Sequence, residues 1–159
     1  MASQYTGKCV AYYAPGDVRI EDMKPLDGPG DGEVIVKVEA CAICGTDIKS
    51  YLKGNPRIKP PMTMGHEFCG EIVEVDSKVE GYQVGQRVTM ATTIGCGECI
   101  YCNQGRTNLC RSAEAIGFHY PGAMAPYLRI PAKAVGQGHL VDVGDKVLLA
   151  EVQPRVSLE

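Results

Sequence analysis

The feature that most constrains the fold of this chain is a cluster of four cysteines within fifteen consecutive positions. Its members are Cys96, Cys99, Cys102 and Cys110. Four thiolates complete a tetrahedral shell around Zn²⁺ with Zn–S distances of about 2.3 Å, and such a closed shell leaves no position for a substrate. The gaps of two residues let successive cysteines turn back on one ion, and nearby glycines permit the tight backbone that this requires. The spacing therefore predicts a structural zinc site in a small lobe.

Other roles for these cysteines fit the spacing less well. The first three match an iron–sulfur run, but in bacterial ferredoxins the fourth cysteine follows sooner and precedes a proline. Here it follows a gap of seven residues and precedes Arg111. Two disulfides would need an oxidising compartment, and the N-terminus carries no apolar stretch typical of a signal peptide. Unligated cysteines are disfavoured by the density of the cluster, so we expect bound zinc and a reducing, cytoplasmic location.

The composition is typical of a globular domain that binds neither nucleic acid nor membrane. Hydrophobic residues make up 45% and charged residues 22% of the 159 positions, enough to bury a core. The formal net charge is -3, and no run of Lys and Arg forms a basic patch. A nucleic-acid or anionic-membrane partner is therefore not expected. No apolar segment is long enough to span a bilayer.

The hydrophobic pattern is mostly of period two, which is typical of half-buried β-strands. Valines at alternate positions between 34 and 38 would face one side of a strand, with Lys37 and Glu39 on the other. Similar short runs occur at Cys9–Tyr13, Val18–Met23, Glu71–Val75, Arg87–Met90 and Tyr127–Ile130. The clearest helical signal is Thr46–Leu52, with Gly45 or Thr46 as its cap. Short strands separated by Gly and Pro predict a mainly β domain, a barrel or a sandwich.

A second set of potential metal ligands lies in two segments of the first half. A catalytic zinc takes fewer protein ligands and keeps a free position for water or substrate. Cys44 would supply a thiolate and His66 an imidazole, and Glu67 or the later Glu151 would complete the set. Asp47 would act through His66 by fixing the tautomer and orientation of its ring. These residues are our candidates for a catalytic metal site.

Each of these residues taken singly also has a simpler interpretation. A lone cysteine is more often a small core residue, and a lone histidine a satisfied polar group. Cys41 and Cys44 form a C-x-x-C pair like that of redox proteins, but they lie in a strand-rich run without the helix of a thioredoxin-like unit. We interpret Cys9, Cys41 and Cys69 as structural or incidental.

Taken in order, these segments resemble the zinc-dependent medium-chain alcohol dehydrogenases. The stretches that carry the resemblance are Gly32–Asp47, Gly65–Val75, Val84–Val88 and the four-cysteine cluster. The Pro60–Glu67 segment is most similar to the sorbitol and threonine dehydrogenase branch. The resemblance implies a GroES-like β-barrel with a few short helices and a zinc-binding lobe.

The resemblance also implies a role for each site residue. Cys44 and His66 would bind the catalytic zinc, with Glu67 beside it, and the four clustered cysteines would bind the structural one. The hydroxyl of Thr46 would relay the substrate proton. The zinc would lower the pKa of an alcohol oxygen, and the alkoxide would give hydride to NAD(P).

The end of the chain carries the weakest part of the resemblance. Leu149-Ala-Glu151 is similar to the Leu-Ala-Glu-Pro segment of the family, whose Glu lies at the catalytic zinc directly or through water, but Val152 replaces the proline. We assign 1–151 to the catalytic domain and leave 152–159 unassigned. No G-x-G-x-x-G lies between a strand and a helix, so a nucleotide-binding Rossmann domain is expected to be absent and NAD(P) to bind only the complete enzyme.

Two functions from different classes follow. The first is the catalytic domain of an alcohol or polyol dehydrogenase, which acts on a small alcohol and is inactive alone. The second is a stand-alone zinc-binding module with a structural or interaction role. A redox or metal-storage protein is disfavoured by the period-two strands. We also expect the chain to form a homo-oligomer through surface left exposed without a second domain.

Overall fold

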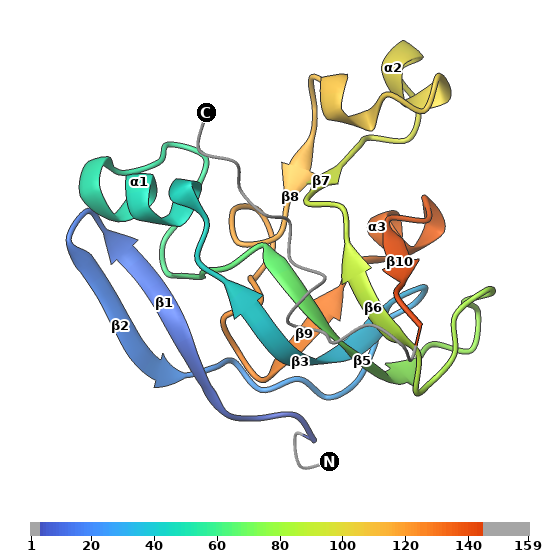
Figure 1. Ribbon diagram of the computed structural model, residues 1–159, viewed down its shortest axis with the longest axis horizontal. Helices are drawn as coiled ribbons and strands as arrows, with labels where there is room; N and C mark the ends of the chain where they lie inside the picture. Colours follow the sequence, from blue (N-terminus) through green and yellow to red (C-terminus); the bar gives the residue numbers. More distant parts are fainter. Residues whose placement is uncertain (1–3, 145–159) are drawn as a thin grey trace.

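The computed structural model describes residues 4–144, which fold into a mainly β domain with three short helices (Figure 1). The larger sheet is antiparallel and has the order β10-β6-β5-β3-β9, and a smaller sheet has the order β2-β1-β4. The strands of the larger sheet are β3 (Val34–Ala42), β5 (Glu67–Val75), β6 (Arg87–Met90), β9 (Tyr127–Ile130) and β10 (Leu140–Asp142). Those of the smaller sheet are β1 (Lys8–Ala14), β2 (Asp17–Asp22) and β4 (Met62–Thr63).

The predicted fold class is confirmed, although the strand ladders of the described part do not close into a continuous barrel. All six predicted strands are present, some of them longer than expected. The sequence patterns missed four strands of two or three residues, because such strands contain too few positions to show alternation. The remaining elements are β7 (Thr93–Ile94), β8 (Glu114–Ala115), α1 (Gly45–Lys53), α2 (Ile100–Asn103), α3 (Ala132–Gly136) and the 3₁₀ turn η1 (Thr107–Leu109).

Strand β3 organises the hydrophobic core, because it lies between β5 and β9. The predicted alternation is confirmed, because Val34 and Val36 are fully buried, Val38 is partly buried, and Lys37 and Glu39 are exposed. Ile35, on the opposite face, is fully buried as well. The register shift between Ile35 and Val36 places the extra residue, Val73, on β5, so the faces of β3 still alternate there. The core around β3 includes Phe68 and Ile72 from β5. Full burial of each such side chain contributes about 1.5–3 kcal/mol.

Helix α1 begins one residue earlier than predicted, and its cap is Cys44 and not Gly45 or Thr46. The Asp47 carboxylate at the third helical position accepts a hydrogen bond from the Cys44 N–H at 2.9 Å, as in a capping box. The helix ends at Gly54, whose φ of 82° favours glycine. Capping therefore fixes the Cys44 thiol at the start of the helix and turns the Asp47 side chain back towards it.

The pairing of β3 with β5 brings the two predicted ligand segments together. Ala42 at the end of β3 pairs with Glu67 at the start of β5. Cys44 follows β3 by two residues, and His66 directly precedes β5. The antiparallel register thus places both segments at one end of the strand pair, although they are far apart in the sequence.

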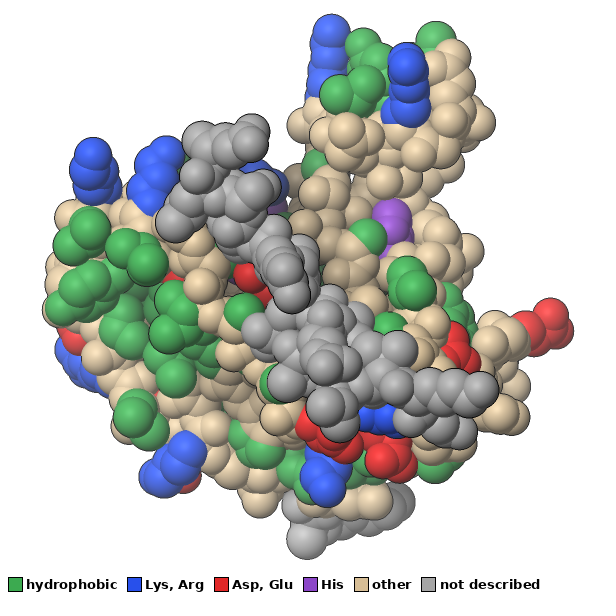
Figure 2. Space-filling model, in the orientation of Figure 1, with side chains coloured by type: hydrophobic (Ala, Val, Ile, Leu, Met, Phe, Trp, Pro, Cys, Tyr) green, Lys and Arg blue, Asp and Glu red, His purple; other side chains and the backbone are tan. Residues whose placement is uncertain are grey.

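The four-cysteine cluster lies on a lobe that projects from the body of the domain (Figures 1 and 2). Its stem is the β7–β8 pair, in which Thr93 pairs with Ala115 and Ile94 with Glu114. The loop between these strands carries α2, η1 and all four cysteines. The predicted lobe is therefore an excursion between two paired strands.

Candidate metal centres

The four cysteines of the lobe converge on one point. Their Sγ atoms lie within 4.8 Å of one another, and the Sγ–Sγ distances are 3.5 Å for Cys99–Cys102 and 3.9 Å for Cys96–Cys102. Tetrahedral ligands with Zn–S distances of about 2.3 Å would be about 3.8 Å apart. No cysteine of the chain forms a disulfide. The arrangement fits one zinc ion with a complete sulfur shell.

The backbone of the lobe favours the thiolate form of Cys96. The N–H groups of Glu98 and Cys99 lower the pKa of the Cys96 thiol to about 6, and the Cys99 N–H lies 3.4 Å from its sulfur. Gly95 is required at the base of the lobe because a Cβ there would lie 2.7 Å from the Cys102 sulfur. Partial burial and the neighbouring sulfur atoms raise the pKa of Cys102 to about 11, so a cation bound among the four sulfurs would be needed to hold all of them as thiolates.

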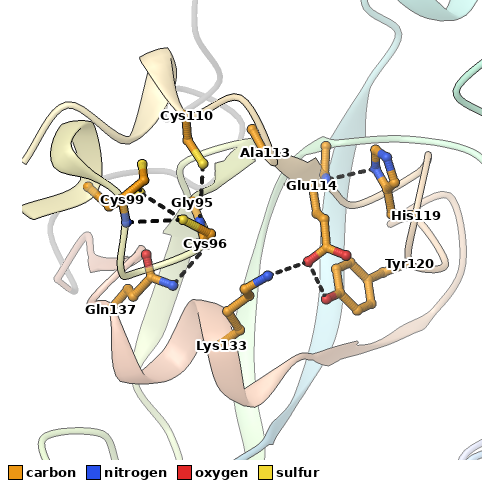
Figure 3. A network of polar contacts seen from close by, with 12 residues as sticks. Gly95, Cys96, Cys99, Cys110, Ala113, Glu114, His119, Tyr120, Lys133 and Gln137 are labelled. Carbon is orange, nitrogen blue, oxygen red and sulfur yellow. Dashed lines mark hydrogen bonds and ion pairs between the residues drawn. The ribbon is translucent and has the colours of Figure 1, made fainter.

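Helix α3 anchors the lobe to the body through a polar network (Figure 3). The Glu114 carboxylate accepts hydrogen bonds from Lys133 at 2.7 Å and from the Tyr120 hydroxyl at 2.9 Å. The bond from Lys133 is the main cause that holds the pKa of Glu114 below its usual range. Gln137 donates to the Gly95 carbonyl at 3.1 Å. The sequence analysis missed these residues, because no motif links positions so far apart.

The second cluster contains Cys44, His66 and Glu67, whose potential ligand atoms lie within 4.8 Å of one another. Nδ1 of His66 and Oε2 of Glu67 are buried and have no hydrogen-bond partner among the described residues. Orphaned polar atoms of this kind are costly unless a ligand satisfies them. The thiolate, imidazole and carboxylate donors fit zinc, and three protein ligands would leave one position open.

Two further predicted residues lie beside this open cluster. The Thr46 hydroxyl is half-buried, 3.6 Å from the Cys44 sulfur. Oδ1 of Asp47 lies 3.7 Å from Nδ1 of His66, too far for a direct hydrogen bond. Burial raises the pKa of Asp47 above its usual range. Asp47 is therefore next to the ring that it is predicted to orient, and Thr46 is next to a potential metal ligand.

The C-x-x-C pair is split between two environments. Cys41 is outside the donor cluster, and burial raises the pKa of its thiol to about 12. It packs against Gly65, where a Cβ would lie 2.7 Å from its sulfur and the φ is 91°. Cys9 and Cys69 are buried. A neutral thiol packed against backbone accords with a structural role for Cys41.

The sequence analysis also missed an aromatic contact at the open cluster. The rings of Phe118 and His66 are 5.4 Å apart at 55°, and the Arg57 guanidinium lies 5.5 Å from the centre of the Phe118 ring. Neither residue belongs to a ligand motif, so only the folded chain reveals this stack. Glu151, the other predicted ligand, lies outside the described residues.

The fold agrees with that of known proteins. Residues 30–142 match the family model of the alcohol dehydrogenase GroES-like domain. The chain belongs to this family, as the N-terminal domain of a zinc-dependent medium-chain dehydrogenase. Zinc and NAD(P) belong to the zinc-dependent dehydrogenases to which this domain is similar, one of which has been solved with NADP bound.

Individual relatives place the GroES-like domain among dehydrogenases of small alcohols. It is 47% identical over 111 residues to L-threonine 3-dehydrogenase of Xanthomonas oryzae pv. oryzae (strain MAFF 311018), a match that covers 68% of this chain and 33% of the relative. A solved structure described as a zinc-binding dehydrogenase of Sinorhizobium meliloti 1021, bound to NADP, is 37% identical with a TM-score of 0.78, over 92% of this chain and 41% of the other. Galactitol-1-phosphate dehydrogenase from Escherichia coli is 25% identical with a TM-score of 0.80, over 92% and 40%. The chain thus spans about a third of the length of the curated relatives that it matches.

Proposed function

We propose that this domain is the catalytic domain of a zinc-dependent alcohol or polyol dehydrogenase. The observation that carries the proposal is the open cluster of Cys44, His66 and Glu67, in which the buried Oε2 of Glu67 has no hydrogen-bond partner among the described residues. Zinc held there would supply Lewis-acid chemistry that lowers the pKa of an alcohol oxygen. Thr46 would take the alcohol proton, because its hydroxyl lies beside the Cys44 sulfur.

The two clusters divide the zinc chemistry between them. The four-cysteine lobe would hold a structural ion, because a complete sulfur shell leaves no place for substrate. The open cluster would hold the catalytic ion, with Glu151 as a further ligand directly or through water. Asp47 would orient His66 through Nδ1, which lies 3.7 Å from its carboxylate, and this leaves the other ring nitrogen, Nε2, to bind the ion.

Hydride transfer also needs a dinucleotide site, and we infer that it lies outside this domain. The named strands of residues 4–144 all pair antiparallel, whereas a pyrophosphate is cradled by a unit of two parallel strands joined by a helix. NAD(P) would therefore act only in the complete enzyme. We expect the isolated chain to give no NAD-dependent oxidation of sorbitol or threonine above background, and measurable turnover would contradict this.

The experiment that tests the proposal is elemental analysis of metal-replete, desalted chain. About two zinc ions per chain are expected, one for each cluster. About one ion would mean that only the lobe is filled. In that case the second candidate function, a stand-alone zinc-binding module, would be favoured, because the lobe alone has a complete ligand set.

We also propose a cytoplasmic location and self-association of the isolated chain. Thiolate clusters need reduced cysteines, and within residues 4–144 no helix is long and apolar enough to cross a membrane. Hydrophobic side chains gather over α1 and the β1–β2 pair (Figure 2), where Ile43, Ile48 and Leu52 are exposed. Sedimentation at increasing concentration should reveal oligomers, and a strict monomer would contradict the prediction.

A further inference from the structure

Arg57 lies in the loop after α1 and is held in place by its neighbours. Its N–H donates to the Asn55 side-chain oxygen at 3.1 Å, and the next residue, Ile58, is a buried anchor. At the other end, the guanidinium donates to the Ala113 carbonyl at 3.4 Å. This is a long hydrogen bond to a neutral acceptor, so it leaves most of the donors of the exposed guanidinium available.

Phe118 contacts both this guanidinium and the His66 ring of the open metal cluster. The ring of Phe118 lies 5.4 Å from the His66 ring and 5.5 Å from the Arg57 guanidinium carbon. The cation is therefore no further from the His66 ring than the sum of these two spacings. Zn–N and Zn–O bonds of about 2 Å and a charge-assisted hydrogen bond of about 2.8 Å would occupy part of that span. Because the sum of the two spacings is an upper limit, a substrate that reaches from the cluster to the guanidinium would have a few carbon atoms at most.

The charges around the cluster indicate which chemical group such a substrate would carry. Cys44, Asp47 and Glu67 bring three potential negative charges to the cluster. A bound Zn²⁺ would therefore leave the cluster without a net positive charge that could attract an anionic group of the substrate. Within residues 4–144, no carboxylate lies within 4.0 Å of the Arg57 guanidinium. Arg57 is thus a cation without an acidic partner at the edge of an otherwise acidic site.

We propose that Arg57 binds the anionic group of the substrate, so that the substrate class is a small alcohol bearing a carboxylate or a phosphate. This inference rests on the proposed function, because it needs the alcohol to bind at the open cluster. The planar guanidinium offers paired donors that match either anion. Packing over Phe118 restricts its motion and so reduces the entropy lost on binding.

The test is a titration of the zinc-loaded chain followed by NMR. The probes are 3-hydroxybutanoate, glycerol 1-phosphate and the uncharged butane-1,3-diol. We expect the dissociation constant of at least one anion to be about tenfold lower than that of the diol, with a shift of the Arg57 Nε–H resonance. The two anions separate a carboxylate from a phosphate preference. Anions that bind no more tightly than the diol would overturn the inference and leave the proposed function intact.

Variants complete the experiment. Arg57→Gln should abolish the preference for the anion, whereas Arg57→Lys should retain part of it, because charge survives without the planar fork. Lys59→Gln is the matched control, since it removes a charge from an exposed residue of the same loop and should keep the preference. Equal loss in Lys59→Gln would overturn the inference in favour of diffuse charge. If no probe shifts the resonances of His66 and its neighbours, both the proposed function and the inference fail.

Discussion

The two candidate metal centres of this domain are assembled in opposite ways. The lobe takes all four ligands from one loop between β7 and β8, and its sulfur atoms form a complete shell. The open cluster takes Cys44 from the end of β3 and His66 and Glu67 from the start of β5, so its geometry depends on the register of a sheet. The difference teaches that a closed local site stabilises the fold, whereas an open site made from distant segments leaves room for chemistry.

The largest expected difference between the centres is in stability. Cys96→Ala should lower the free energy of unfolding by about 4 kcal/mol, because zinc bound to a closed site contributes directly to folding. Cys44→Ala should cost less, since the ends of β3 and β5 are already paired through the sheet. Thermal unfolding of both zinc-loaded variants measures the difference. Equal melting temperatures would remove the distinction between the two centres.

Asp47 offers a sharper test that touches only the open cluster. Asp47→Asn should weaken zinc binding at Cys44 and His66 about 10- to 100-fold, because the carboxylate beside the imidazole is replaced by a neutral amide. The lobe should keep its zinc. Competition with a coloured chelator resolves the two affinities, and Asp22→Asn on the exposed end of β2 is the matched control. A loss of affinity in both variants would contradict the assignment.

The smallest expected effect concerns the anchor of the lobe. Glu114→Gln should cost about 1 kcal/mol at pH 7, because it weakens the contacts to Lys133 and Tyr120. The pKa of Glu114 in the folded chain lies below its usual value, mainly because of Lys133. The stabilisation is therefore fully present above the ordinary glutamate pKa of about 4.3 and is lost as the pH falls through the lower folded value.

Denaturant unfolding of the wild type and Glu114→Gln at a series of pH values measures this difference. Zinc release at low pH affects both proteins, so only the difference between them is compared. It should stay constant from pH 7 down to about 5 and shrink below about pH 4. A difference that grows on acidification would show that the carboxylate does not act through Lys133.

Local sequence patterns predicted the lobe and most strands, because spacing and alternation are properties of neighbouring residues. The residue types suggested the ligands of the open cluster and the family resemblance assigned their roles, and the Ala42–Glu67 pairing explains why its segments meet. The burial of Ile35 on the opposite face of β3 was not predicted, because alternation describes only which residues share a face and not whether both faces are covered. The helix cap at Cys44 was missed because cysteine is not a usual capping residue.

Other parts of the site could not be read from the sequence. The contacts of Phe118 with His66 and of Lys133 with Glu114 join residues from distant segments. Neither pair has a spacing rule, because each depends on how the lobe, α3 and the loops pack after the sheets have formed. Such contacts follow from tertiary packing and leave no periodic signal in the chain.

The register between Ala42 and Glu67 also has a consequence for the order of assembly. The lobe closes a short loop, so zinc can gather its cysteines while most of the chain is still unfolded. The open cluster forms only after β3 and β5 have found each other, and long-range pairing of this kind is a slower event. Zinc binding at the open cluster during refolding would therefore report when β3 and β5 reach their native register.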